Sequence, residues 1–179
     1  KQAIAWTLKS IMRTKPLDKI TVKELVEACE INRQTFYYHF QDIYDLLGWI
    51  YRTEALDSIR DNKSYDTWQQ GALTILKYIQ DNRELCINTY RSVAREHLEA
   101  FLHEVLYGLL SDVVDEVAGA QPLPPGSKDF VAKFYSYAFA GVLLDWINSG
   151  LKTPATTIVE NIARIMDGIV PLAVRRFQQ

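Results

Sequence analysis

Apolar residues recur with the spacing of an α-helix along almost all of the 179 residues, and the alternation typical of strands never persists. Only six prolines and eight glycines interrupt this pattern. A chain of this length can bury a sizeable hydrophobic core. The sequence therefore predicts an all-α protein of about nine helices.

Short helices near the N-terminus form the clearest local pattern. The sequence TVKE at residues 21–24 is a capping box, in which the threonine hydroxyl accepts a first-turn amide hydrogen bond while the glutamate reaches back. A three-residue turn follows, and Asn32 is suited to cap the next helix. Together with a first helix that ends near Pro16, these helices predict a helix-turn-helix domain over residues 1–45.

Longer helices are expected over the rest of the chain, which predicts a second all-helical domain at residues 46–179. Three prolines and two glycines mark residues 119–129 as the main loop. Gly168 and Pro171 predict a kink or a break in the last helix. The expected helices of this domain run from Asp42 through Ile59, over residues 66–80, 83–90, 94–117 and 130–149, and from Pro154 onward.

The segment at residues 32–40 ends in five consecutive ring-bearing residues. On a helical wheel, Phe36 and Phe40 share one face and can enter a core together with Leu25. Other aromatic side chains of the segment must then point outward, where they either cover neighbouring helices or contact a ligand. The outward-facing residues are Gln34, Tyr37 and Tyr38.

The charge distribution gives the N-terminal helices a separate character. The formal net charge of the chain is −2, so no overall basicity points to nucleic acid. Residues 1–40, however, hold seven basic and four acidic residues, a net +3, which leaves −5 for residues 41–179. A basic head on an acidic body is expected when only the head meets a polyanion. Arginine and glutamine suit guanine and adenine edges, and hydroxyl groups suit phosphates, so the segment favours DNA.

Residues 20–47, ITVKELVEACEINRQTFYYHFQDIYDLL, resemble the DNA-binding domain of the TetR family of bacterial transcription regulators. The stretch RQTFYYHFQDIYDLLGWI is similar to regulators of dihydroxyacetone-kinase operons within that family. The resemblance implies phosphate contacts at the start of the second helix and base or backbone contacts along the third. The implied DNA-binding residues are Thr21, Lys23, Asn32, Arg33, Gln34, Thr35, Tyr37, Tyr38 and His39.

Two positions depart from the pattern of the family. Glu30 stands in the turn where the family usually has glycine, and this substitution should strain the turn slightly. Ile43 stands where the family often has a lysine that contacts phosphate, so one expected charge is absent. Neither departure overturns the resemblance.

Residues 139–166, FAGVLLDWINSGLKTPATTIVENIARIM, resemble the C-terminal pair of helices of the same family, which dimerise as a four-helix bundle. The apolar surface of these helices is too broad for one neighbour, so a second copy of the chain is expected to cover it. The alternative is that these residues fill the core of a single chain. The candidate dimer residues are Phe139, Val142, Leu143, Trp146, Ile158, Ile162 and Ile165.

Aromatic residues of the body helices could line a cavity for an effector, although aromatics at helical spacing are more often core residues. Asp145 could meet a cationic ligand or pair with an arginine across a dimer, and the sequence leaves both open. The candidate pocket residues are Trp68, Tyr78, Tyr90, Phe101, Tyr107, Tyr135 and Asp145.

Patterns typical of enzymes and of metal or cofactor sites are absent from the sequence. Glu99 and His103 have the spacing of a solvated helix pair, so we expect neither a metal nor a cofactor. Cys29 and Cys86 are expected to be buried, reduced thiols rather than a disulfide. No signal peptide is expected, and residues 134–144 are too short an apolar stretch to span a membrane. We therefore expect a soluble, cytoplasmic protein.

These observations together favour a homodimeric transcription regulator that binds a palindromic operator on double-stranded DNA. The expected mode is repression, with release when a small-molecule or protein effector binds the body. One alternative is an activator that works through a protein co-regulator. Another is a protein-interaction module that uses the aromatic head for docking.

Overall fold

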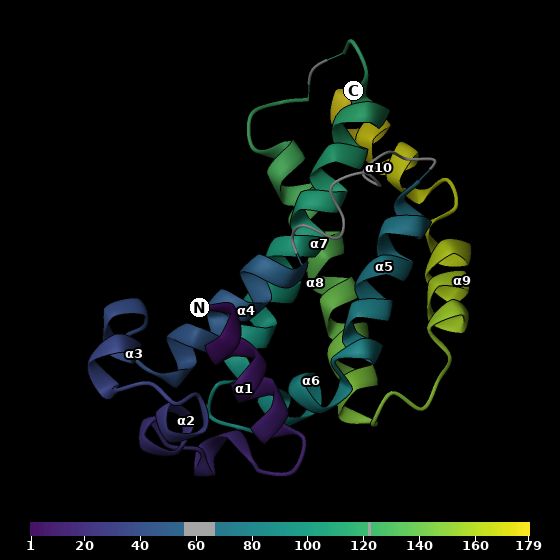
Figure 1. Ribbon diagram of the computed structural model, residues 1–179. Helices are drawn as coiled ribbons and strands as arrows, with labels where there is room; N and C mark the ends of the chain where they lie inside the picture. The colour runs from purple at the N-terminus through teal and green to yellow at the C-terminus, as the bar shows by residue number, and fades with distance from the viewer. Residues whose placement is uncertain (56–66, 122) are drawn as a thin grey trace.

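A computed structural model describes residues 1–55, 67–121 and 123–179, and it confirms the all-α prediction for these residues. The fourth predicted helix extends through Ile59, which lies outside the described residues. The helices, shown in Figure 1, are α1 (Gln2–Met12), a short 3-10 helix η1 (Leu17–Lys19), α2 (Val22–Ala28), α3 (Arg33–His39), α4 (Ile43–Ala55), α5 (Trp68–Asp81), α6 (Arg83–Tyr90), α7 (Arg95–Ala118), α8 (Ser127–Asn148), α9 (Ala155–Met166) and α10 (Ile169–Gln178).

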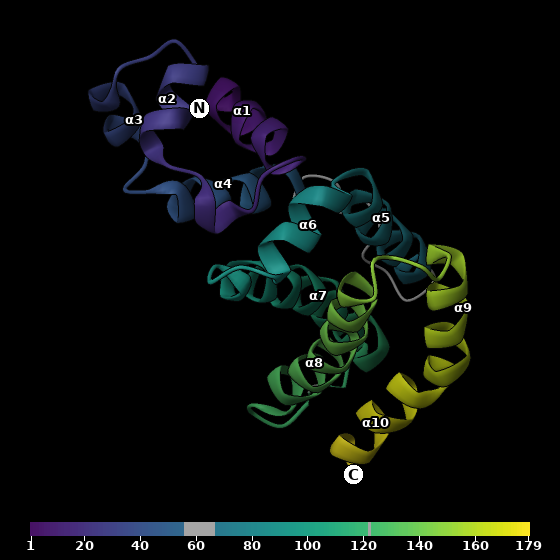
Figure 2. The ribbon, with the colours of Figure 1, turned by 90° about the horizontal axis from the view of Figure 1, so that it is seen from below.

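The first three α-helices form a head that projects from one side of the molecule, as Figures 1 and 2 show. Helix α2 packs against both α1 and α3, and α3 lies farthest from the helices of the body. Leu8, Leu25 and Phe36 are each fully buried. Helix α4 leaves the head and packs against both α1 and α7, so the predicted boundary at residue 45 falls inside a continuous helix.

Hydrogen bonds at the helix ends explain the local structure of the head. The Thr21 hydroxyl oxygen accepts a hydrogen bond from the Glu24 amide at 3.2 Å, which is the predicted cap of α2. The second half of the predicted capping box is wrong, because the Glu24 carboxylate instead pairs with Lys15 Nζ at 2.5 Å. The Asn32 side chain caps α3 by accepting from the Thr35 amide at 2.7 Å, as predicted.

The turn between α2 and α3 is a Schellman motif. The Ile31 amide donates to the Val26 carbonyl at 3.0 Å, and the Glu30 amide donates to the Glu27 carbonyl at 3.2 Å. This motif requires a left-handed residue after the helix, and Glu30 adopts a φ of 54°. Glycine usually fills such a position because it has no Cβ to clash with the backbone. The expected strain at Glu30 thus has a specific backbone cause.

The body is built around α7 and α8, which pack against each other along their length. Helices α6 and α10 pack against both members of this pair, α5 packs against α7, and α9 packs against α5 and α10. Figure 2 shows α5, α9 and α10 along one side of the body. The last predicted helix is broken rather than kinked: α9 ends at Met166, and Gly168 precedes α10 with a left-handed φ of 71°. Pro171 lies in the first turn of α10, where a missing amide hydrogen costs no helical hydrogen bond.

Helix α8 has two apolar sides. One side, which includes Ala132, Ala140 and Leu143, is buried in the core of the body. The opposite side exposes Phe134 and Tyr137 to solvent. Among the described residues, α8 is the one helix whose length and composition would suit a membrane span, and its packing against α7 accounts for much of that apolar character.

Polar contacts join the head to the body at a seam between α1 and α6. The Asn88 side-chain amide donates to the carbonyls of Met12 and Lys15 at 3.0 and 2.7 Å. The Asn88 side-chain oxygen accepts from the Leu17 amide at 2.7 Å. Closer to the N-terminus, Lys9 pairs with Glu54 of α4 at 2.8 Å. The end of α1 is therefore held by a side chain from the body.

Replacing Glu30 with glycine should raise the free energy of unfolding by about 1 kcal/mol. The left-handed conformation costs a residue with a Cβ roughly 1–2 kcal/mol, and the greater freedom of glycine in the unfolded chain offsets part of that gain. Denaturant titration of the two proteins measures the difference. Glu30→Ala is the matched control, because alanine keeps the Cβ and removes the charge. An equal gain for alanine would show that the charge, and not the backbone, is the cause.

Candidate nucleic-acid interface

Helix α3 presents one buried side and one exposed side, and its aromatic residues are divided between them. Phe36 is 0% exposed and Phe40 is 3% exposed, so both rings belong to the core of the head. Tyr38 is 84% exposed and Tyr37 is 56% exposed. This division follows the helical wheel, and it leaves two tyrosine rings on a surface that no described element covers.

The first turn of α3 adds polar side chains to the same exposed surface. Arg33, Gln34 and Thr35 are all exposed, and no acidic residue lies in this turn. Asn32 is already engaged, because its side-chain oxygen accepts from both the amide and the hydroxyl of Thr35. Its amide group remains free to donate. Asn32 therefore fixes the start of α3 and can offer a ligand only hydrogen-bond donors.

The other candidate residues lie at the start of α2 and the end of α3. Thr21 is exposed, and its hydroxyl can still donate a hydrogen while the oxygen caps α2. The ammonium of Lys23 lies 3.8 Å from the Glu27 carboxylate, a loose and exposed pair that a phosphate could replace. His39 is half-buried, and its ring meets the Tyr38 ring edge to face at 5.0 Å. All nine candidates thus belong to α2 and α3 and their caps.

The candidate dimer residues lie mostly inside the single chain. Phe139, Leu143, Trp146, Ile158 and Ile162 are buried, because α8 and α9 turn these side chains into the core of the body. Only Val142 and Ile165 of the predicted seven are exposed. Other apolar side chains, missed by the sequence analysis, share the outer surface of α8 and α10: Phe130, Phe134, Tyr137, Leu172 and Phe177.

The spacing of the aromatic residues in the sequence of α8 indicates this outer surface. Phe130, Phe134, Tyr137 and Gly141 follow one another at intervals of three or four residues, which places them on one side of α8. The ring of Phe130 lies 6.3 Å from the ring of Phe177, so the outer surfaces of α8 and α10 are continuous. We call the exposed side chains Phe130, Phe134, Tyr137, Val142, Ile165, Leu172 and Phe177 the apolar strip.

Among the hollows lined by described residues, none brings the candidate pocket residues together. Trp68 packs against Phe139, and the Tyr78 hydroxyl lies 3.4 Å from the Glu54 carboxylate. Tyr107 donates a hydrogen bond to Asp129 and lines a hollow of about 210 Å³. Two larger hollows, of about 290 and 460 Å³, lie at the seam between α1 and α6. The other six candidate pocket residues line none of these three hollows: Trp68, Tyr78, Tyr90, Phe101, Tyr135 and Asp145.

Two titratable side chains of the body are engaged in packing. Burial raises the pKa of the Cys86 thiol to about 12, so this cysteine stays protonated and unreactive. Burial also lowers the pKa of His103, whose ring contacts the Tyr137 ring at 4.5 Å. Within the part of the chain that the structure describes, no three His, Cys, Asp or Glu side chains come together to hold a metal ion.

Two family models match the chain. Residues 9–48 match the model described as bacterial regulatory proteins, tetR family. Residues 66–168 match the model described as transcriptional regulator C-terminal region, which by itself covers more than half of the chain. The first match contains α2 and α3, and the second extends from the start of α5 to the break between α9 and α10.

Similar proteins include a curated regulator from Lactococcus lactis subsp. lactis (strain IL1403), the HTH-type dhaKLM operon transcriptional activator DhaS. It is 35% identical over 80 residues, which cover 45% of this chain and 43% of that protein. The match therefore spans less than half the length of the curated relative.

Solved structures share the fold over nearly the whole chain. A dihydroxyacetone kinase operon activator DhaS superposes with a TM-score of 0.72 and 23% identity, over 99% of this chain and 97% of that one. NalD, the secondary repressor of the MexAB-OprM multidrug efflux pump in Pseudomonas aeruginosa, superposes with a TM-score of 0.61 and 16% identity, over 93% of this chain and 92% of that one. The TetR family repressor AlkX from Dietzia sp. strain DQ12-45-1b superposes with a TM-score of 0.56 and 16% identity, over 99% of this chain and 98% of that one.

Tyr38→Ala and Phe36→Ala should separate the exposed surface of α3 from its core. Tyr38→Ala is expected to change the free energy of unfolding by less than about 0.5 kcal/mol while weakening binding to a DNA duplex. Phe36→Ala should lower the unfolding free energy by about 3–5 kcal/mol, because it leaves a cavity. Denaturant titration and a duplex-binding assay measure both quantities. Unchanged duplex affinity in Tyr38→Ala would remove this tyrosine from the interface.

Proposed function

Because the chain belongs to the TetR family of bacterial regulatory proteins, we propose that it acts as a homodimer that sets two heads on a palindromic operator. Membership makes it a DNA-binding transcription regulator and not an enzyme. The observation that carries the proposal is the exposed surface of α3, where Tyr38 and Gln34 lie outward above the buried Phe36. Since its DNA lies in the bacterial cytoplasm, we expect the protein to act there.

Helix α3 is proposed to enter the major groove of the operator. Its first turn would bring Arg33 to the paired acceptors of a guanine and Gln34 to an adenine. The Thr21 hydroxyl, the Lys23 ammonium and the tyrosine hydroxyls would contact phosphates, which position the head without reading sequence. We propose that residues 1–45 form this DNA-binding domain, and that residues 46–179 provide dimerisation and regulation.

The apolar strip supports a dimer. Four of its side chains lie on α8, one lies on α9 and two lie on α10, and the Phe130 and Phe177 rings join the outer surfaces of α8 and α10. Exposed large apolar side chains in this number on a small protein usually meet a partner, and a second copy can supply the matching surface by two-fold symmetry. A dimer of this kind would place the two α3 helices about 34–36 Å apart, one turn of DNA.

The similar proteins differ in whether they activate or repress transcription. The curated relative at 35% identity is named an operon activator, whereas NalD and AlkX are named repressors. The expectation of repression drew on the commoner mode of the family. We propose activation as the mode of this chain, because the activator is the relative with the highest identity among these three. Repression remains the second candidate, favoured by the two solved repressors of the same fold.

Phe134→Glu should break the dimer and reduce operator binding. A carboxylate in the middle of the apolar strip would lose its hydration when the two copies meet. Sedimentation should then report a single chain, and affinity for a palindromic duplex should fall by about 100-fold or more, because two linked heads bind far more tightly than one. Val93→Glu is the matched control, since Val93 is also an exposed apolar residue but lies outside the strip. A wild-type protein that sediments as a monomer would refute the proposal.

A transcription assay decides the sign of regulation. Selection from random duplexes first supplies the operator, and the protein is then added to purified bacterial polymerase on a promoter that carries it. We expect RNA output to rise with protein concentration, and to stay at the basal level with Arg33→Ala, which should lose about 1–3 kcal/mol of operator binding. A fall in output with the wild-type protein would assign repression instead.

A further inference from the structure

We propose that the seam between head and body binds a small oxyanion, namely the phosphate or carboxylate group of a low-molecular-weight metabolite. The seam is the groove between α1 with its following loop and helix α6. It contains two adjoining hollows of about 290 and 460 Å³, which have Arg13 and Glu84 as shared lining residues. This space lies outside the α3 surface and outside the candidate pocket of the body.

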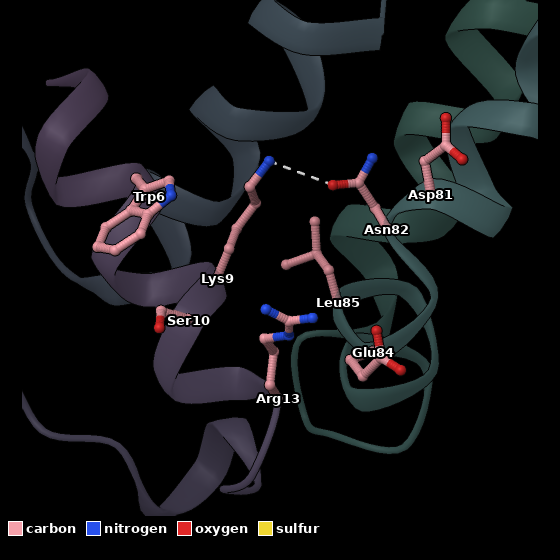
Figure 3. A pocket seen from close by; sticks show the side chains of 8 residues that line it. All are labelled: Trp6, Lys9, Ser10, Arg13, Asp81, Asn82, Glu84 and Leu85. Atoms are coloured by element: carbon pink, nitrogen blue, oxygen red, sulfur yellow. Dashed lines mark hydrogen bonds between the residues drawn. The ribbon is translucent and has the colours of Figure 1, made fainter.

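Two exposed arginines that line the groove have no counterion among the residues that the structure describes. Arg13 extends from the end of α1 toward α6, as Figure 3 shows, and none of the side chains drawn there forms a hydrogen bond with it. Arg91 follows the last residue of α6 and lines the larger hollow. Among the described residues, neither guanidinium pairs with a carboxylate. Both are therefore available to an anion.

The remaining charged groups of the groove have partners. Lys9 pairs with Glu54 at 2.8 Å, and Lys15 pairs with Glu24 at 2.5 Å. Of the acids, Asp81 pairs with Lys77 at 3.2 Å, and Asp18 accepts a hydrogen bond from the Val93 amide at 3.3 Å. Glu84 lies 3.7 Å from its neighbour Arg83. Two guanidinium charges thus stand against one carboxylate, that of Asp18, whose hydrogen bond is to a neutral amide, and the balance in the groove is positive although the body as a whole is acidic.

The start of α6 adds a second attraction for an anion. Asn82 precedes this helix but does not cap it, because its side chain accepts from Lys9 Nζ at 3.2 Å and donates to the Tyr78 carbonyl at 3.0 Å. An uncapped helix N-terminus offers backbone amides and a partial positive charge. Asn82 and Leu85 line the smaller hollow, so this end of the helix faces the groove.

Guanidinium groups suit the proposed ligand class. Their paired N–H groups match the two oxygens of a carboxylate or a phosphate, and such charge-assisted bonds are about twice as strong as neutral ones. A volume of 290–460 Å³ accommodates a small metabolite rather than a folded partner. The groove has room for an organic body beside the charged group.

A ligand in the seam would touch both parts of the protein. Arg13 belongs to the head, whereas Arg83 and Arg91 belong to the body. An anion that bridges them stabilises one angle between head and body and so changes the population of the arrangement that fits the operator. Only this regulatory consequence rests on the proposed function. The binding itself does not.

The test measures anion binding in the absence of DNA. Orthophosphate and citrate are titrated separately into the full chain by calorimetry, with chloride adjusted to keep the ionic strength constant. We compare the wild type, an Arg13→Gln/Arg91→Gln double variant, and Arg164→Gln, which removes an exposed arginine of α9 outside the groove. Saturable binding of at least one anion is expected, unchanged in Arg164→Gln and weaker by about tenfold or more in the double variant.

Two results would overturn the proposal. One is the lack of saturable binding of either anion by the wild type; the other is equal binding by the double variant. A further measurement separates small anions from the DNA backbone, by titrating a random duplex into each protein. If the double variant loses duplex affinity while the wild type binds neither anion, the arginines serve DNA instead. A failure to bind any operator leaves the anion titration intact, so the two proposals fail separately.

Discussion

The side chain of Asn88 is the contact on which the arrangement of head and body depends. The last turn of α1 leaves carbonyl groups without helical partners, and a buried or half-buried carbonyl in this state is costly. Asn88 supplies two donors to Met12 and Lys15, and it accepts from Leu17. These three hydrogen bonds from one side chain fix the direction of α1 relative to the body. Because α1 packs against α2 and α2 packs against α3, they also set the orientation of α3.

Local patterns in the sequence predicted the helices but could not predict every partner. The caps at Thr21 and Asn32 lie within three residues of their acceptors, so the sequence carries them directly. The Asn88 contacts join residues more than 70 positions apart, and an asparagine in mid-helix gives no sign of them. Arg13 and Arg91 line one hollow from positions 78 residues apart, which no local pattern in the sequence indicates.

The candidate dimer residues illustrate a limit of periodicity. Helix α8 is apolar on both sides. The periodicity of apolar residues identifies which faces of a helix are apolar, but it does not identify the element that packs against each face. Phe139 and Leu143 satisfy the pattern and fill the core of the chain, while Phe134 and Tyr137 satisfy it equally well and remain exposed. Only packing against the other helices of the body, such as Trp68 of α5 against Phe139, distinguishes the two groups. Trp68, one of the pocket candidates, is likewise buried in the core, where it packs against Phe139.

The apolar strip makes the stability of the folded protein depend on the concentration of the protein when a second copy covers it. A chain that leaves several large rings in water folds to a less favourable state alone than when a second copy covers them, so mass action makes its stability depend on concentration. Soon after synthesis, when few copies exist, those rings also offer an attachment point to chaperones or to unrelated chains. If the proposed homodimer is the form that binds the operator, the cell would hold an active regulator only above a threshold number of molecules.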